Sequence, residues 1–253
     1  MKHKSFSVFD AAGHGFRLTF KNIGLFFVVG LIWIGFGIAY QALMALAWIG
    51  ARFFAPGMQQ MMQMQQQDPM AMMKTGFGAL LKMGLVAFVI ILVVFLISAL
   101  VGLALRLGYT QILFDVHDKK KSRASRLFSC FGLLGKYIGA SILLSLIFLG
   151  VFVFSMAVGW VFALIAKPFG LFVSVVLASV LTLILAVRLH FVRFFIVDKD
   201  AGPMEALNMS FYATRGHFWR LFCAMLLAPW MMITIIGIPA TGIMFTSIYR
   251  KIT

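Results

Sequence analysis

The sequence predicts an all-α integral membrane protein, a bundle of about six transmembrane helices with short amphipathic helices at the cytoplasmic surface. Composition is the first reason. Hydrophobic residues make up 62% of the chain and charged residues 11%, against roughly 45–50% and about 25% in soluble domains. The second reason is that several apolar runs exceed the ~18 residues that cross a hydrocarbon core as a helix. The ~10-residue alternating segments of a β-barrel are missing from the sequence.

The predicted spans are the apolar runs between charged residues and Gly or Pro breaks, within a single transmembrane domain over residues 1–253. They cover residues 23–49, 79–105, 137–165, 169–192, 218–236 and 239–250. The sixth is short, because a helix of that length reaches only ~18 Å.

Basic residues predict the orientation, because short cytoplasmic loops of membrane proteins are rich in Lys and Arg. We place both termini, a basic loop at 106–136 and the segment 188–220 on the cytoplasmic side of a bacterial inner membrane. Of the 22 Lys and Arg residues, only four then lie opposite: Arg52, Lys74, Lys82 and Lys167. A Met- and Gln-rich loop at 52–78 is expected on the outer face.

The segment 198–216, "DKDAGPMEALNMSFYATRG", holds three of the seven carboxylates and predicts a short helix along the membrane surface. Gly202 suits the N-cap, Pro203 the first turn, and Glu205 complements the positive end of the helix. Gly216 suits a left-handed stop. Near the N-terminus, Ser7 and Asp10 resemble a capping box and predict a second surface helix.

Several short motifs lie between residues 188 and 222: an Arg-containing span end, "VD", "GPxEAL", a Ser-aromatic pair and "TRG". The residues that carry them are Arg188, Val197, Asp198, Gly202, Pro203, Glu205, Ala206, Leu207, Ser210, Phe211, Thr214, Arg215, Gly216 and Trp219. This segment resembles the signature of poorly characterised bacterial multi-pass membrane proteins, the YciC-like proteins and the membrane domain attached to some glycerophosphodiester phosphodiesterases. The resemblance implies a multi-pass inner-membrane protein. It does not imply phosphodiesterase activity, because the sequence shows neither the soluble catalytic domain nor a metal-binding set of carboxylates and His.

Catalytic motifs are missing, since the sequence contains no GxSxG, no HExxH and no pair of carboxylates within a predicted span. An intramembrane hydrolase or a proton-coupled pump usually buries at least one carboxylate. We therefore expect no enzymatic activity, no cofactor and no metal site.

Basic residues at the cytoplasmic ends of two spans are candidates for binding an anion. Arg188, His190 and Arg193 lie near the end of the fourth span, and Arg106 lies at the matching end of the second. Arg offers a fork of donors that suits phosphate, although ordinary snorkelling to the interface is the more common explanation of such residues, with Arg188 the strongest exception because it is deepest. The loop triplet Lys119, Lys120 and Lys121 is a second candidate for anionic headgroups.

The stretch "MQQMMQMQQQDPMAMM" (58–73) offers thioethers, the soft ligands that Cu(I) prefers. Its weak candidates are Met58, Met61, Met62 and Met64. The Gln-rich filler and the lack of any His in the stretch favour a simple loop or a short interfacial helix.

The leading functional hypothesis is a non-enzymatic membrane module that organises lipids, or binds a protein partner, through its basic cytoplasmic surface. Under it, lipid binding survives Arg188→Ala and is lost when Lys119, Lys120 and Lys121 are neutralised. Nucleic acid is not expected, because the basic residues form no continuous stripe with interleaved aromatics. The alternatives are a transporter or channel for a small anionic or lipid-like substrate, using Arg188, and in third place copper handling.

Overall fold

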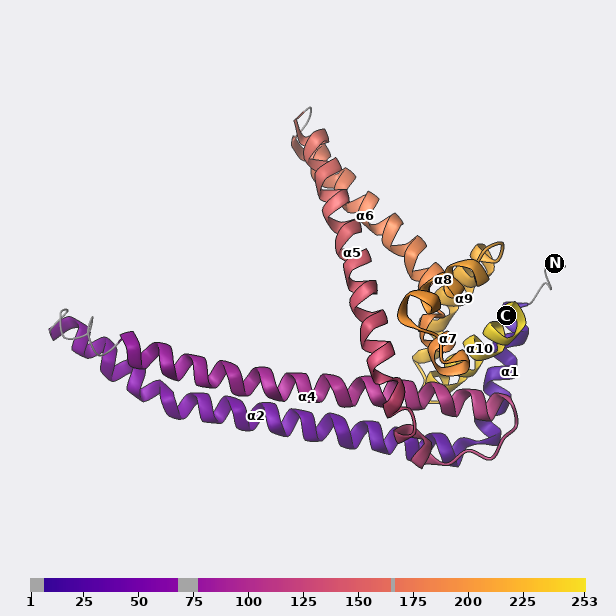
Figure 1. The fold of residues 1–253 in the computed structure, drawn as a ribbon, viewed down its shortest axis with the longest axis horizontal. Coiled ribbons are helices and arrows are strands. Elements are labelled where there is room, and N and C mark those ends of the chain that lie inside the picture. The colour runs from indigo at the N-terminus through magenta and orange to yellow at the C-terminus, as the bar shows by residue number, and fades with distance from the viewer. Residues whose placement is uncertain (1–6, 68–76, 165–166) are drawn as a thin grey trace. The chain divides into compact units, whose positions relative to one another are not determined.

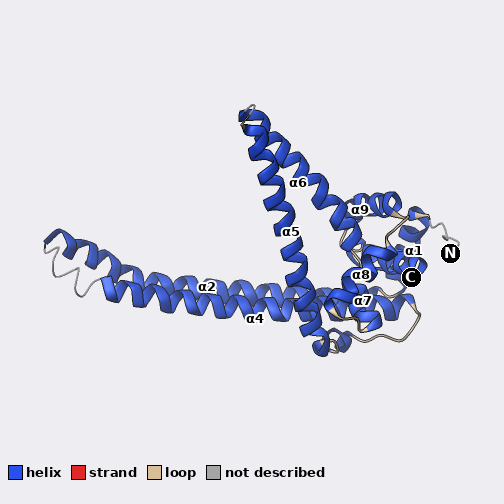
Figure 2. Ribbon diagram, turned by 45° about the horizontal axis from the view of Figure 1, so that its top comes forward, coloured by secondary structure: helices blue, strands red, loops and turns tan. Residues whose placement is uncertain are grey.

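The structure is a computed structural model that describes residues 7–67, 77–164 and 167–253. These residues are helical almost throughout and contain no strand (Figure 1 and Figure 2). The elements are α1 (Val8–Lys21), α2 (Ile23–Gln67), α4 (Phe77–His117), the 3-10 helices η2 (Ala124–Phe128) and η3 (Phe131–Leu133), α5 (Leu134–Ala163), α6 (Lys167–Leu189), α7 (Val192–Lys199), α8 (Pro203–Ala213), α9 (Phe218–Met232) and α10 (Gly237–Ile252). The predicted all-helical class is confirmed.

Four helical stretches of the described residues are long and apolar enough to cross a membrane. They are Ile23–Leu46, Ile91–His117, Ala124–Ala163 and Phe169–Lys199, and Phe218–Met232 is a shorter apolar helix. They overlap the first four predicted spans. The chain thus has the helices of a membrane protein, as its composition predicts.

The chain, expected to form one domain, divides into two compact units. Unit 1 comprises Met1–Phe26 and Leu103–Thr253, and unit 2 comprises Phe27–Gly102. Both α2 and α4 run across a boundary between the units.

Unit 2 is a hairpin of two long helices, since its parts of α2 and α4 lie side by side in both views (Figure 1 and Figure 2). Large apolar side chains point outward from both helices, among them Phe27 and Ile38 on α2 and Phe95 and Leu96 on α4. An apolar surface of this size is more stable in contact with lipid than in contact with water.

The prediction of a loop at 52–78 is wrong for residues 52–67, because α2 continues as a helix to Gln67. The predicted span ended at residue 49, before Gly50 and the charge of Arg52. The Met, Gln and Ala residues that follow are strong helix formers, which favours continuation. The side chains of Met58, Met61, Met62 and Met64 lie outside the described residues, so the copper hypothesis keeps only its sequence argument.

The predicted basic loop at 106–136 also starts too early, since α4 extends to His117. The sequence argument ended the span at the first charge, Arg106. Ile112, Leu113 and Phe114 follow it, and all three are buried in the folded chain. Burial of these side chains outweighs the single charge and keeps the helix going for three more turns.

The core of unit 1 is built around α10, which is buried along almost its whole length. Its Tyr249 ring stacks on Phe194 of α7 with 5.5 Å between centroids, and Phe114 of α4 meets the Phe194 ring edge-on at 5.8 Å. Phe191 and Phe245 complete this aromatic core. The segment predicted as a short sixth span is therefore enclosed by protein rather than exposed on an apolar face.

Helix α1 packs directly against α10. A side chain at Gly15 would overlap the carbonyl of Ala240, so the backbone at the middle of α1 is in contact with the backbone of the first turn of α10. The predicted cap of α1 is confirmed, because Ser7 Oγ accepts a hydrogen bond from the N–H of Asp10 at 3.4 Å.

Helices α5 and α6 form an apolar hairpin whose tip is closed by small residues. A side chain at Gly159 would overlap Ser174, and one at Gly170 would overlap the carbonyl of Gly159. Small residues at such contacts let membrane helices approach closely. Large apolar side chains such as Leu149 and Phe172 point away from the hairpin.

Candidate functional site

The fourth predicted span does not end as a single helix. α6 stops at Leu189, residues His190 and Phe191 form a turn, and α7 begins at Val192. A break of this kind leaves the last carbonyls of α6 without helical partners. Ser210 Oγ of α8 donates to the carbonyl oxygen of Arg188 at 2.8 Å, and Thr214 Oγ1 lies 3.5 Å from the same oxygen.

The motifs between residues 188 and 222, which we call the signature segment, thus have a structural role that the sequence did not reveal. Ser210 and Thr214 are fully buried and lie one helical turn apart, so both face the break. Ala206 shares that buried face and lets α8 approach closely. Arg215, by contrast, is exposed.

The predicted ends of α8 are confirmed. Gly202 is the N-cap, and its N–H donates to the carboxylate of Glu205 at 3.3 Å, with Pro203 in the first turn. Gly216 adopts φ 85°, the left-handed conformation expected of a helix stop.

Arg188 lies beside α8. Its guanidinium carbon is 4.9 Å from the centre of the Phe211 ring, a cation–π contact. Its Nη1 atom is buried without a hydrogen-bond partner among the described residues. A buried guanidinium nitrogen without a partner is costly, which marks Arg188 as a position where an acceptor would be favourable.

A second set of polar side chains gathers where α4, α5 and α7 meet, and we name it the arginine–tyrosine cluster. It consists of Arg106, Tyr109, Tyr137, His190 and Arg193. Arg193 interacts electrostatically with Arg106, Tyr109 and Tyr137, and also with His190. Arg106 is exposed, and the other four members are half-buried. Arg188, at the end of α6, contacts Phe211 of α8.

Two polar atoms of the arginine–tyrosine cluster are buried without a hydrogen-bond partner among the described residues: Tyr109 Oη and His190 Nε2. The His190 ring is packed among aromatic side chains and lies 4.3 Å from the Phe245 ring, centroid to centroid. Neither Arg106 nor Arg193 forms an ion pair in the described part of the chain. The cluster is therefore positive and has unsatisfied hydrogen-bonding capacity.

Tyr109 and Tyr137 were missed by sequence reasoning. A Tyr near the end of an apolar span is common at the membrane surface, and nothing local distinguishes these two from others. Only the meeting of α4, α5 and α7 brings them to Arg193.

Asp198 of the signature segment belongs to a different network, which fixes the C-terminal helix. Arg250 pairs with Asp118 at 2.8 Å and with Asp198 at 3.1 Å, and Tyr249 Oη donates to Asp198 at 3.0 Å. Partial burial works against ionisation of Asp118, but the hydrogen bond from His117 and the charge of Arg250 prevail and lower its pKa. The network is an ion-paired structural element.

His14 of α1 lies beside this network, with its ring 5.7 Å from that of His117. Partial burial, followed by the charges of His117 and Lys251, lowers the pKa of His14 below 6.5. His14 is therefore neutral near pH 7 and adds no charge to the Asp118 and Arg250 pair.

The triplet Lys119, Lys120 and Lys121 is exposed in the connection after α4. The triplet is part neither of the surroundings of Arg188 nor of the arginine–tyrosine cluster. None of the three lysines forms an ion pair among the described residues. The connection is fixed beyond the triplet, because a side chain at Gly108 of α4 would overlap the backbone of Leu127.

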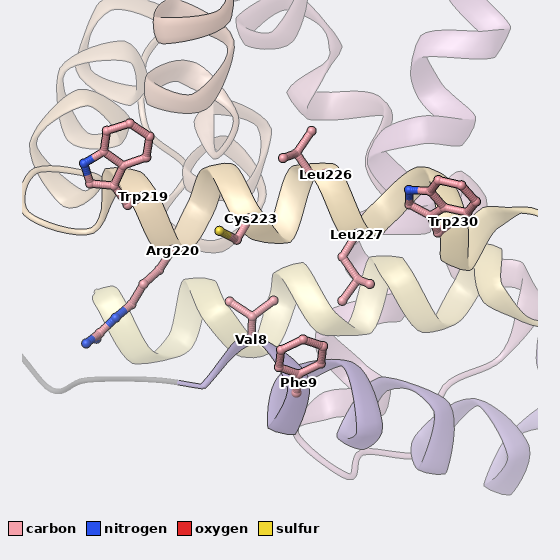
Figure 3. Close-up of a pocket in the computed structure, with 8 residues that line it drawn as sticks. All are labelled: Val8, Phe9, Trp219, Arg220, Cys223, Leu226, Leu227 and Trp230. Atoms are coloured by element: carbon pink, nitrogen blue, oxygen red, sulfur yellow. The ribbon is translucent and has the colours of Figure 1, made fainter.

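An open groove of about 570 Å³ lies between α1 and α9 (Figure 3). It is lined by Val8, Phe9, Trp219, Arg220, Cys223, Leu226, Leu227 and Trp230. Apart from the Arg220 guanidinium this lining is apolar, so the groove lacks the set of polar groups that would orient a reacting substrate. Among the described residues, no three His, Cys, Asp or Glu side chains lie close enough together to hold a metal ion.

Comparison with known proteins gives one match. Residues 119–249, just over half of the chain, match the family described as "Domain of unknown function (DUF7847)". No curated protein and no solved structure matches the chain. The matched region runs from the lysine triplet to Tyr249 and so includes α5 to α9, the broken helix and the signature segment. The chain therefore belongs to the DUF7847 family.

Proposed function

We propose that this protein is a non-enzymatic membrane module of the bacterial cytoplasmic membrane that binds anionic lipids through a basic cytoplasmic surface. One observation carries the proposal: the negative charges of this surface are too few to neutralise its positive charges. The five acids of residues 103–253 are all engaged within the fold. Asp115 lies 3.8 Å from Arg126, Asp118 and Asp198 hold Arg250, Asp200 pairs with Lys136, and Glu205 caps α8.

The basic residues that remain are exposed and have no ion pair among the described residues. They include Arg17, Lys21, Arg106, Lys119, Lys120, Lys121, Arg123 and Arg215. Each Lys or Arg near an anionic leaflet contributes about 1 kcal/mol of attraction. The surface therefore favours anionic headgroups more than a compensated surface of equal size would.

The proposed orientation keeps both termini, α1 and the signature segment in the cytoplasm. Four crossings by the long helices return the chain to its starting side, as six would. The packing of α10 favours four membrane crossings over six. The first turn of α10 touches the middle of α1, which carries the exposed charges of Arg17 and Lys21, so a crossing α10 would draw these charges into the bilayer.

The resemblance to the YciC-like proteins supports the same proposal at the level of membrane setting. It rests on the motifs between residues 188 and 222, and these include Ser210 and Thr214, whose hydroxyls stabilise the broken helix. We propose that relatives with this segment share the break.

The lipid preference is tested by reconstituting the full chain into nanodiscs with equal amounts of phosphatidylcholine and phosphatidylglycerol. Mass spectrometry of the lipids retained around the protein should show enrichment of phosphatidylglycerol. Neutralising Lys119, Lys120 and Lys121 to Gln should remove most of that enrichment. The matched control neutralises Arg52, Lys74 and Lys82, three basic residues predicted on the opposite side, and should preserve it. Equal retention of both lipids by the wild-type protein contradicts the proposal.

Transport of a small anion is a second candidate, favoured by the buried, unpartnered Nη1 of Arg188 near the end of a long apolar helix. Charged groups in such positions often mark ion pathways. Anion efflux from proteoliposomes that depends on the protein, and is lost with Arg188→Gln, would establish this function. Efflux equal to that of protein-free liposomes would exclude it.

A further inference from the structure

We infer that the arginine–tyrosine cluster of Arg106, Tyr109, Tyr137, His190 and Arg193 is a binding site for a phosphate group. The inference deepens the proposed function, on which it rests for its membrane setting, by naming one site and the chemistry of its ligand. It differs from the general attraction of a basic surface, because it requires particular hydrogen-bond donors that converge from several helices.

The charge of the cluster requires an anion. Two guanidinium groups lie within electrostatic range of each other, and no carboxylate of the described residues pairs with either. Like charges this close repel, and half-burial strengthens the repulsion because less water screens it. A bound anion removes that cost. Arg106 is exposed, so an anion can reach the cluster without unfolding it.

The donors of the cluster favour phosphate over a carboxylate or a halide. Each guanidinium presents a planar fork that suits two oxygens, each phenol adds one O–H, and His190 adds an N–H in its Nε2–H tautomer. These donors come from α4, α5, α7 and the turn before α7. A carboxylate offers two oxygens from one side, whereas a phosphate presents oxygens in several directions. Phosphate therefore satisfies donors that arrive from different elements.

The unpartnered atoms give independent support. Tyr109 Oη and His190 Nε2 are both buried and have no hydrogen-bond partner among the described residues. Buried polar atoms of native proteins nearly always have one, and leaving such an atom unpaired costs about 1–3 kcal/mol. A phosphate oxygen held by Arg193 would provide an acceptor close to both.

The phosphate can belong to a lipid headgroup or to a soluble ion, and one set of measurements separates them. Native mass spectrometry of the detergent-purified full chain compares phosphatidic acid with diacylglycerol of the same acyl chains, which lacks only the phosphate. Thermal unfolding in millimolar inorganic phosphate, against chloride at equal ionic strength, tests the soluble source. We expect phosphatidic acid to bind and diacylglycerol not to bind. Stabilisation by inorganic phosphate alone would support the site with a soluble ligand.

Variants assign the binding to the cluster. Arg193→Gln should weaken phosphatidic acid binding about tenfold or more, since a hydrogen bond to a charged group is worth at least that factor. Tyr109→Phe removes one hydroxyl, leaves the ring packing intact and should weaken binding several-fold, so it keeps the test valid if Arg193→Gln does not fold. The matched controls are Tyr212→Phe, on an exposed tyrosine, and Arg52→Gln, on an arginine predicted to lie on the opposite side of the membrane; both should bind as the wild type does.

The outcomes distinguish this inference from the proposed function. Loss of binding with Arg193→Gln and Tyr109→Phe, but not with the controls, supports the site whether or not the lysine triplet matters. Binding that is unchanged in both cluster variants overturns the site. If in that case neutralising Lys119, Lys120 and Lys121 still removes lipid enrichment, the proposed function stands without it. Failure of both phosphatidic acid and inorganic phosphate to bind the wild-type protein also overturns the site.

Discussion

Ser210 Oγ donates a hydrogen bond to the main-chain carbonyl of Arg188 at 2.8 Å, across 22 residues of sequence. The bond joins α8 to the end of α6 at the point where the long apolar helix breaks. A carbonyl left unpaired at the end of α6 would be costly, because the helix no longer supplies a donor there. The hydroxyl therefore stabilises the break, which lies between Arg188 near the end of α6 and Arg193 in the first turn of α7.

Ser210→Ala should lower the free energy of unfolding by about 1–3 kcal/mol, because it leaves a buried carbonyl with a weaker partner. Thr214→Val in the same background should add to the loss, since Thr214 Oγ1 reaches the same carbonyl. Thermal unfolding in detergent measures both effects. Ser179→Ala is the control, because the exposed Ser179 hydroxyl donates only within its own helix. Equal effects at Ser210 and Ser179 would show that the bond to Arg188 does not stabilise the break.

The close contact of α5 and α6 makes a second prediction. Gly159→Ala should destabilise the protein by about 1–3 kcal/mol, because the new methyl group overlaps Ser174 and forces the helices apart. Gly150 lies on the same helix with open space around it, so Gly150→Ala should be neutral or stabilise the helix by up to about 1 kcal/mol. Thermal unfolding of the two variants side by side tests this, and a similar shift in both would contradict the tight contact.

Much of the local structure was predictable, because it depends on neighbouring residues. Ser7 and Gly202 begin helices as expected, and Gly216 ends one, since caps and left-handed stops depend on local backbone chemistry. The first four spans were predictable because their length and apolarity leave few alternatives.

The break at His190 and Phe191 was not predictable, because neither residue is a helix breaker and the donors that stabilise it follow some twenty residues later, on α8. The arginine–tyrosine cluster was only half found, since Tyr109 and Tyr137 join it through tertiary packing. The extent of α2 was misjudged because the span was ended at Gly50 and Arg52, although the Met and Gln residues that follow have high helix propensity.

From the ion pair of Arg250 and Asp118 we predict that the stability of the fold depends on pH in the acid range. The pKa of Asp118 is lower in the folded chain than its ordinary value of 3.8, so folding favours the ionised form. This stabilisation is complete above about pH 5 and is lost as the pH falls through 3.8 toward the lower folded value. Asp118→Asn should lower stability at pH 7 by no more than about 1 kcal/mol, because the pair is partly exposed.

The measurement is thermal unfolding of the wild type and Asp118→Asn between about pH 7 and pH 3, where carboxylates titrate. The difference between the two proteins should shrink as the pH falls. Asp10→Asn is a control, because Asp10 forms no ion pair among the described residues. A difference that grows toward low pH would contradict the assigned direction of the pKa shift.

The packing of α1 on α10 predicts where the α9–α10 connection lies. Gly15, in the middle of α1, meets Ala240 in the first turn of α10, so the start of α10 lies at the depth of α1, whose Arg17 and Lys21 are exposed and must remain at the surface. The connection between α9 and α10 exposes Ile233 and Ile235, apolar side chains suited to the hydrocarbon, while the N–H of Gly237 is satisfied locally by Thr234. We expect α9 and α10 to enter from the cytoplasmic side and return to it.

Cysteine labelling in whole cells tests this arrangement in a background without Cys130 and Cys223. A membrane-impermeant maleimide should label Gln65→Cys from outside, and Thr253→Cys only after the membrane is permeabilised. Thr234→Cys should resist labelling from outside, because the connection does not reach the outer surface. Labelling of Thr234→Cys as readily as Gln65→Cys would show that α9 and α10 both cross, which restores six crossings and leaves the packing of α1 against α10 in need of another explanation.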